Sequence, residues 1–122
     1  MRSYPELIEK LKPYKGEQHY YEPDFGYIAW QESTGNNVEL LFIEVKEPGK
    51  GHATSLVKYM CQNIQPYNSV FVFRLASNEP AGHFYRKLGF EEILIKGLYK
   101  EDAVLGVVSY KQLCQNLYNN HA

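Results

Sequence analysis

A glycine-rich turn between a strand and a helix is the feature that most limits what this chain can fold into. Residues 38–45 (VELLFIEV) are rich in β-branched and apolar side chains, which predicts a strand. The turn Pro48–Ala53 (PGKGHA) follows, and apolar residues then recur to Ile64 at the spacing of one helical face. A helix that begins at such a turn presents unpartnered backbone N–H groups and a partial positive charge. The stretch is a candidate phosphate site or a plain strand-to-helix connection.

Three residues of this turn favour an anionic ligand. Gly49 and Gly51 allow backbone to approach a ligand with no Cβ in the way, and Lys50 adds a full positive charge. The turn lacks the Gly-Lys-Ser/Thr ending of a P-loop and also lacks a Gly-x-Gly-x-x-Gly pattern. Both absences count against a nucleotide-binding domain.

Length and charge exclude several classes of protein. With 122 residues the chain is predicted to form one domain, 1–122. Its 13 basic and 14 acidic residues show no basic stripe, so nucleic acid is not an expected partner. The apolar runs are too short to cross a bilayer, and the amino end has no signal-peptide pattern. We expect a cytoplasmic protein with no membrane partner.

No metal site is predicted. The four histidines show no metal spacing, and the two cysteines, Cys61 and Cys114, form no metal motif. Both cysteines fall on apolar helical faces, so we expect them to be reduced core residues, and Cys61 to be a poor nucleophile.

The remaining pattern predicts a mixed sheet with helices on its faces. In chain order the predicted elements are helix 3–13, strand 25–31, strand 38–45, helix 53–64, strand 69–76, helix 79–88, strands 90–96 and 103–109, and helix 110–118. Strands 25–31 and 38–45 are expected to form an antiparallel hairpin, as are the last two strands. Strands 38–45 and 69–76 flank a helix, so they are expected to lie parallel. Residues 14–24 are turn-rich, and a short strand at Tyr20 and Tyr21 is left open because Pro23 limits it.

Two motifs, taken together, resemble the GNAT superfamily of acetyl-CoA-dependent N-acetyltransferases. The family's phosphate turn, Arg/Gln-x-x-Gly-x-Gly/Ala, corresponds to Pro48–Ala53. A second signature, Asn-x-x-Ala-x-x-Phe-Tyr-x-Lys-x-Gly-Phe, is complete here as Asn78, Ala81, Phe84, Tyr85, Lys87, Gly89 and Phe90. The resemblance covers about residues 25–109 and identifies the chain as a small member.

The resemblance implies a fold and a cosubstrate site. It implies an α/β fold whose mixed, mostly antiparallel sheet has a central splayed parallel strand pair and helices on both faces. Acetyl-CoA (coenzyme A) would lie in the splay, with its pantetheine arm on the first parallel strand and its diphosphate on the turn at 49–54. The implied cofactor-binding residues are Ile43, Val45, Gly49, Lys50, Gly51, His52, Ala53, Thr54, Asn78, Phe84 and Tyr85.

The chain departs from the family pattern in two places. Pro48 replaces the family's Arg or Gln, which removes the side-chain donors and one backbone N–H. Lys50 compensates in charge but not in fork geometry. The amino-terminal part is also short, so we expect the family's usual first strand and paired helices to be reduced to one helix.

The expected reaction needs an acid and a base. Attack on a thioester requires a neutral amine, and a free alkyl amine has a pKa of about 10.4, so a base must remove a proton. The leaving thiolate benefits from a proton donor, and Tyr85 occupies the family's position for that acid. The alternative is that Tyr85 is a half-buried helix residue with a satisfied hydroxyl.

Two glutamates are candidates for the base. Because side chains alternate along a strand, Glu39 and Glu44 are expected to lie on opposite faces, so that only one can face the cofactor. Glu39 shares parity with Ile43 and Val45 and is favoured, whereas Glu44 lies nearer the acetyl end and could line the substrate groove. The alternative for both is a solvated or paired carboxylate.

The predicted function is therefore transfer of an acetyl group from acetyl-CoA to a primary amine, by direct attack in a ternary complex. The alternative is a non-catalytic acyl-CoA-binding module that contacts a partner protein. The acceptor could be a polyamine, an amino acid, an antibiotic amine or a protein amino group. A monomer and a homodimer are both open, and strand 103–108 or the terminal helix could pair two copies.

Overall fold

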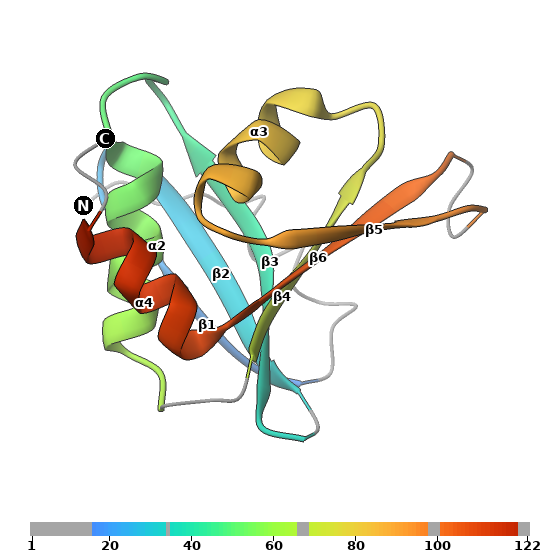
Figure 1. The fold of residues 1–122 in the computed structure, drawn as a ribbon. Coiled ribbons are helices and arrows are strands. Elements are labelled where there is room, and N and C mark those ends of the chain that lie inside the picture. The colour runs from blue at the N-terminus through green and yellow to red at the C-terminus, as the bar shows by residue number, and fades with distance from the viewer. Residues whose placement is uncertain (1–15, 34, 66–68, 98–100, 120–122) are drawn as a thin grey trace.

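The computed structural model describes residues 16–33, 35–65, 69–97 and 101–119, and it confirms the mixed α/β architecture (Figure 1). The elements of these residues are β1 (Glu17–Tyr21), β2 (Gly26–Ser33), β3 (Asn37–Val45), α2 (His52–Gln62), β4 (Ser69–Leu75), α3 (Glu79–Lys87), β5 (Glu91–Ile95), β6 (Ala103–Ser109) and α4 (Tyr110–Asn119). The helix predicted over residues 3–13 lies outside the described residues. No helix in the described ranges has the length and apolar character needed to cross a membrane.

The six strands form one sheet in the order β1-β2-β3-β4-β6-β5. β3 and β4 are parallel, and the other four neighbouring pairs are antiparallel. The predicted hairpins β2-β3 and β5-β6 and the predicted β3-α2-β4 unit are all confirmed. The parallel pair lies in the middle of the sheet, as the resemblance implies.

Two expectations about the sheet edges are wrong. The expected loss of the first strand does not hold, because residues 17–21 form β1 and pair with β2. Ring stacking holds this strand, since His19 lies 5.7 Å from Trp30 and Tyr21 lies 3.7 Å from Tyr59, centroid to centroid. Strand 103–108 is also not free to pair with a second copy, because β6 runs between β4 and β5.

The described helices gather on one side of the sheet. α2, α3 and α4 contribute to a single core cluster with alternate residues of β2, β3 and β4. α2 and α4 lie next to each other, and α3 covers the end of the sheet that carries β5 and β6 (Figure 1). A smaller cluster on the other side joins Tyr27 and Ala29 to Leu41 and Phe42.

A β-bulge in β3 changes which side chains share a face. Ala29 pairs with Phe42 but its neighbour Trp30 pairs with Leu40, so Leu41 is an extra residue in β3. The extra residue inverts the alternation, and Glu39 and Glu44 therefore lie on the same face. The prediction that they lie on opposite faces is wrong because strict alternation does not hold across a bulge.

Hydrogen bonds to β2 confirm this shared face. The Gln31 side-chain amide donates to Glu39 Oε1 at 3.0 Å, and the Tyr27 hydroxyl donates to Glu44 Oε2 at 2.7 Å. Tyr27 and Gln31 are four residues apart on one strand, so they project to the same side of the sheet.

Candidate active site

The two parallel strands part halfway along their length. The ladder between β3 and β4 runs from Asn37 opposite Ser69 to Leu40 opposite Val72. Beyond Val72, β4 continues with β6 alone, and beyond Leu40, β3 continues with β2 alone, within the part of the chain that the structure describes. The bulge lies where the strands begin to separate. The splay that the resemblance implies is therefore present.

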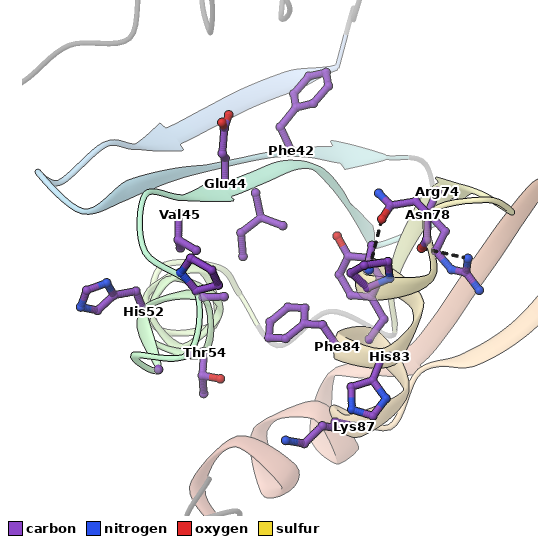
Figure 2. A pocket seen from close by; sticks show the side chains of 18 of the residues that line it. Phe42, Glu44, Val45, His52, Thr54, Arg74, Asn78, His83, Phe84 and Lys87 are labelled. Carbon is purple, nitrogen blue, oxygen red and sulfur yellow. Dashed lines mark hydrogen bonds between the residues drawn. The ribbon is translucent and has the colours of Figure 1, made fainter.

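A cavity of about 710 Å³ opens at this splay, between the two strands, the start of α2 and one side of α3 (Figure 2). The predicted site residues that line it are Ile43, Glu44, Val45, Gly49, Gly51, His52, Ala53, Thr54, Asn78, Phe84 and Tyr85. Glu39 and Lys50 are not among its lining residues. The structure thus brings together most of the residues that two separate motifs suggested.

The start of α2 fits an anionic group. Gly51 caps the helix with φ of 77°, with no side-chain cap and no acidic residue in the first turn. A Cβ added at Gly49 or Gly51 would meet nothing within 4 Å, so the space in front of this turn is open. His52 stacks on Phe25, and its Nδ1 is buried with no hydrogen-bond partner among the described residues. Backbone N–H groups of this first helical turn are available to phosphate oxygens.

The start of α3 is held differently. The Asn78 side-chain oxygen accepts from the Ala81 backbone N–H at 3.3 Å, which confirms Asn78 as the N-cap. Tyr85 follows two turns later with 6% of its surface exposed. Burial raises the pKa of Tyr85 to about 12, and the nearby Arg74 guanidinium opposes part of that rise. The Tyr85 hydroxyl therefore keeps its proton at neutral pH.

Arg74 is a cavity residue that sequence reasoning missed. It lies on β4 with the same parity as the buried Val70 and Val72, and it is itself 9% exposed. A charged residue at an inward position of a strand is a signal of a paired or functional group. Strand parity could have found it from the sequence.

The two candidate bases occupy different surroundings. Glu44 and Phe42 project to the side of β3 opposite Val45, and both line the cavity (Figure 2). Glu39 lies further back along the paired part of β3, where burial raises its pKa and the bond from Gln31 opposes that rise. Of the two carboxylates, Glu44 is the one at the cavity.

Comparison with known proteins identifies the family. Residues 17–112, most of the chain, match the family model described as the acetyltransferase (GNAT) domain. The chain belongs to the GNAT acetyltransferase family. As a GNAT member it is an acyltransferase that uses acetyl-CoA as cosubstrate, as the sequence predicted. No curated protein sequence matches the chain.

Solved GNAT structures share the fold at low sequence identity. Nourseothricin acetyltransferase matches with a TM-score of 0.67 and 21% identity over 76% of this chain and 65% of its own. The ribosomal-protein-S18-alanine N-acetyltransferase from Escherichia coli has a TM-score of 0.70 and 15% identity, over 90% of this chain and 79% of its own. A GNAT family acetyltransferase from Elizabethkingia anophelis with acetyl-CoA bound has a TM-score of 0.69 and 16% identity, over 88% and 83%. At these identities the likeness concerns the fold, and the acceptors of these proteins do not transfer to this chain.

Proposed function

We propose that this GNAT protein transfers the acetyl group of acetyl-CoA to a primary amine by direct attack in a ternary complex. The observation that supports this is the cavity at the splay, which has Tyr85 in its wall on the α3 side and Glu44 in its wall on the β3 side. An acid and a base at one cavity are what a single-step transfer between a thioester and an amine requires.

The cosubstrate would lie along three surfaces of the cavity. The turn at residues 49–54 would hold the diphosphate through its backbone N–H groups. The backbone of Ile43 and Val45, which no β4 residue pairs in the described part of the chain, would bond the pantetheine amides. Asn78 and Phe84 would contact the arm from the α3 side.

Tyr85 would act as the general acid. As the amine nitrogen attacks the thioester carbonyl and the C–S bond breaks, the Tyr85 hydroxyl would donate its proton to the leaving sulfur. Its pKa of about 12 means that the hydroxyl is protonated at every pH at which the protein would work. We therefore expect no loss of rate from Tyr85 ionisation between pH 7 and 10.

Glu44 would act as the base. Its carboxylate is held by the Tyr27 hydroxyl at 2.7 Å and lines the cavity on the side of β3 away from Val45. An amine that approaches from that side would meet Glu44 before it reaches the thioester, and Glu44 would keep the proton that the amine loses. Glu39 remains the other candidate, and a Glu39→Gln variant serves as the comparison for Glu44→Gln.

Thiol release with a panel of amine acceptors tests the proposal. With the wild-type protein and an accepted amine, Tyr85→Phe should lower kcat about 100-fold, the loss typical of a general acid. Tyr118→Phe is the matched control, because Tyr118 is exposed on α4 and outside the cavity lining. Binding of acetyl-CoA without thiol release from any amine would favour the non-catalytic acyl-CoA-binding module instead.

A further inference from the structure

We propose that Arg74 is a positioning residue for this reaction: its guanidinium fixes the turn between β4 and α3 and thereby sets where Asn78 and Tyr85 lie against the thioester. This inference rests on the proposed function, since Tyr85 is its reference point. It assigns a role to a charged side chain in the cavity wall that neither sequence motif includes.

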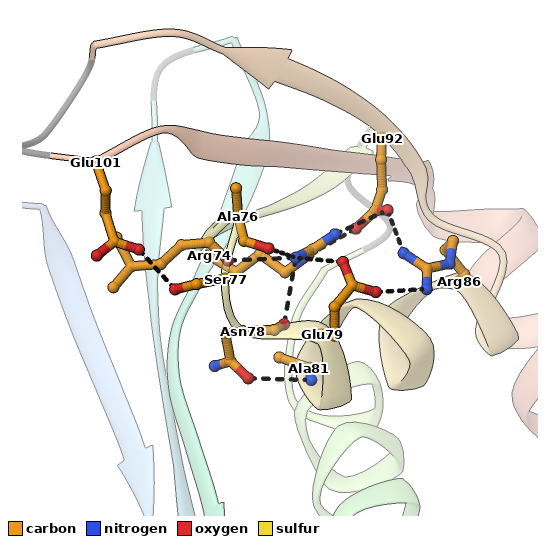
Figure 3. Close-up of polar contacts among 10 residues, drawn as sticks. Arg74, Ala76, Ser77, Asn78, Glu79, Ala81, Arg86, Glu92 and Glu101 are labelled. Atoms are coloured by element: carbon orange, nitrogen blue, oxygen red, sulfur yellow. Dashed lines mark hydrogen bonds and ion pairs between the residues drawn. The ribbon is translucent and has the colours of Figure 1, made fainter.

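Arg74 binds the backbone of the turn between β4 and α3. Its Nη1 lies within hydrogen-bond distance of three backbone carbonyl oxygens, those of Leu75 at 3.2 Å, Ala76 at 3.3 Å and Asn78 at 3.2 Å, so two N–H groups are shared among three acceptors (Figure 3). These oxygens belong to the residues that lead into α3. One cation therefore binds three of the four carbonyl oxygens from Leu75 to Asn78 and fixes the backbone that carries the Asn78 side chain.

A carboxylate on β5 fixes the guanidinium in turn. Nε of Arg74 donates to Glu92 Oε2 at 2.9 Å, and Nη2 donates to Glu92 Oε1 at 3.2 Å, a two-point geometry that lysine cannot make. Only 6% of the Arg74 side chain and 16% of the Glu92 side chain are exposed. Arg86 on α3 also bonds Glu92, at 2.7 Å, and lies 3.5 Å from Glu79. Glu92 is thus connected to both ends of α3, to the first through Arg74 and to the last through Arg86.

α3 rests directly on the guanidinium. A Cβ added at Gly82 would lie 2.6 Å from Arg74 Cζ, so the helix approaches this closely only because residue 82 has no side chain. Tyr85 is one turn further along the same helix. A displaced guanidinium would therefore shift the helix that carries the Tyr85 hydroxyl, and a shift of about 1 Å at a reacting group costs on the order of 100-fold in rate.

A double-mutant cycle between Arg74 and Tyr85 tests the proposal. Arg74→Lys keeps the charge but serves fewer of the five acceptors, so we expect kcat to fall at least 10-fold in the wild-type background. In the Tyr85→Phe background the same change should lower kcat by less than about 2-fold, because the group that Arg74 positions is already absent. Equal factors in the two backgrounds, or an Arg74→Lys variant with wild-type kcat, would overturn the proposal.

Two further variants keep the test independent of folding. Lys111→Arg changes one cation for another at an exposed position of α4, outside the cavity lining and the contacts of Arg74, and we expect it to change kcat by less than about 2-fold. If Arg74→Lys does not fold, Gly82→Ala displaces the guanidinium from the α3 side with Arg74 still present, and kcat should again fall about 10-fold. A folded Gly82→Ala variant with wild-type kcat would overturn the inference.

The same assays separate this inference from the proposed function. If the wild type neither binds acetyl-CoA in calorimetry nor releases thiol, the proposed function fails and the inference fails with it. If the wild type turns over and the cycle shows no coupling, only the role of Arg74 fails.

Discussion

Two helix starts face the same cavity and are built in opposite ways. At the start of α2, Gly51 provides no side-chain cap, the first turn has no acidic residue, and a buried ring nitrogen of His52 lacks a partner among the described residues. At the start of α3, Asn78 caps the helix, and Arg74 collects the carbonyls of the turn that precedes it. The N-terminus of α2 at Gly51, here called the open start, is suited to binding an external anion. The N-terminus of α3 at Asn78, here called the closed start, is suited to holding a side chain in one position.

The difference shows how one fold divides two tasks between similar local structures. Backbone N–H groups that the protein leaves unsatisfied are costly unless a ligand or water satisfies them, so they belong where a ligand binds. A side chain that must contact a reacting atom has the opposite requirement. The hydrogen bonds and packing that hold it in position should be complete before the ligand binds.

Loss of the Glu92 carboxylate, which pairs with Arg74 next to the start of α3, should cause the largest loss of stability. Glu92→Gln leaves the buried Arg74 guanidinium without its counter-charge, and we expect the free energy of unfolding at pH 7 to fall by about 3 kcal/mol. Hydrogen bonds from Arg74 lower the pKa of Glu92 below 4.5 in the folded protein. The contribution of the pair is therefore fully present above about pH 4.5 and is lost as the pH falls through the lowered pKa.

Urea unfolding at several pH values measures this effect. The stability difference between wild type and Glu92→Gln should shrink as the pH is lowered below 4.5, because the unfolded wild-type chain then binds a proton at Glu92 that the folded chain, with its lowered pKa, does not. Glu91→Gln is the matched control, since Glu91 is the exposed neighbour on the same strand. A difference that stays constant down to pH 3 would contradict the assigned pairing.

Substitution of Gly51, at the start of α2, should weaken the binding of acetyl-CoA more than it destabilises the fold. Gly51→Ala forces a residue with a Cβ into a φ of 77°, at a cost of about 1–2 kcal/mol. The new Cβ meets no protein atom within 4 Å and instead enters the space proposed for the diphosphate. We expect the Kd for acetyl-CoA, measured by calorimetry, to rise about 10-fold. Lys58→Ala, on the same helix and outside the cavity lining, should leave that Kd unchanged.

Changes at Asn78 separate its two roles. Asn78→Ala should cost about 1 kcal/mol of stability through loss of the helix cap, and Asn78→Ser should recover most of it because serine also caps well. Both variants lack the amide proposed to contact the pantetheine arm, so both should raise the KM for acetyl-CoA by a similar factor. Recovery of KM together with stability in the serine variant would show that capping alone explains the residue.

The order of elements could be predicted from the sequence because it depends on local patterns. The run from Val38 to Val45 is rich in apolar and β-branched residues, and Asn78 and Gly89 mark the two ends of α3 by their capping preferences. The splay and the cosubstrate site came from the resemblance, which depends on the two motifs. The expected cytoplasmic location and the oligomeric state stay predictions.

Features that depend on pairing between distant segments could not be predicted. Nothing in LLFIE marks Leu41 as an extra residue, because a bulge is defined by the partner strand and not by its own sequence. The sequence leaves β1 open because its partners are remote in the chain: Tyr21 stacks on Tyr59, and the whole strand pairs with β2. Lys50 stays a predicted phosphate ligand, at a position next to the residues that line the cavity.

The extra residue in β3 makes this strand sensitive to length in a way that substitution does not reveal. The bulge reverses the alternation of side chains between the two halves of β3. Deletion of Leu41 would therefore move either Glu39 or Glu44 to the other face of the sheet, although no other residue is changed. Single insertions and deletions between these glutamates should therefore abolish function in a library in which most point changes are tolerated. In the proposed mechanism, the number of residues in β3 matters as much as their identity.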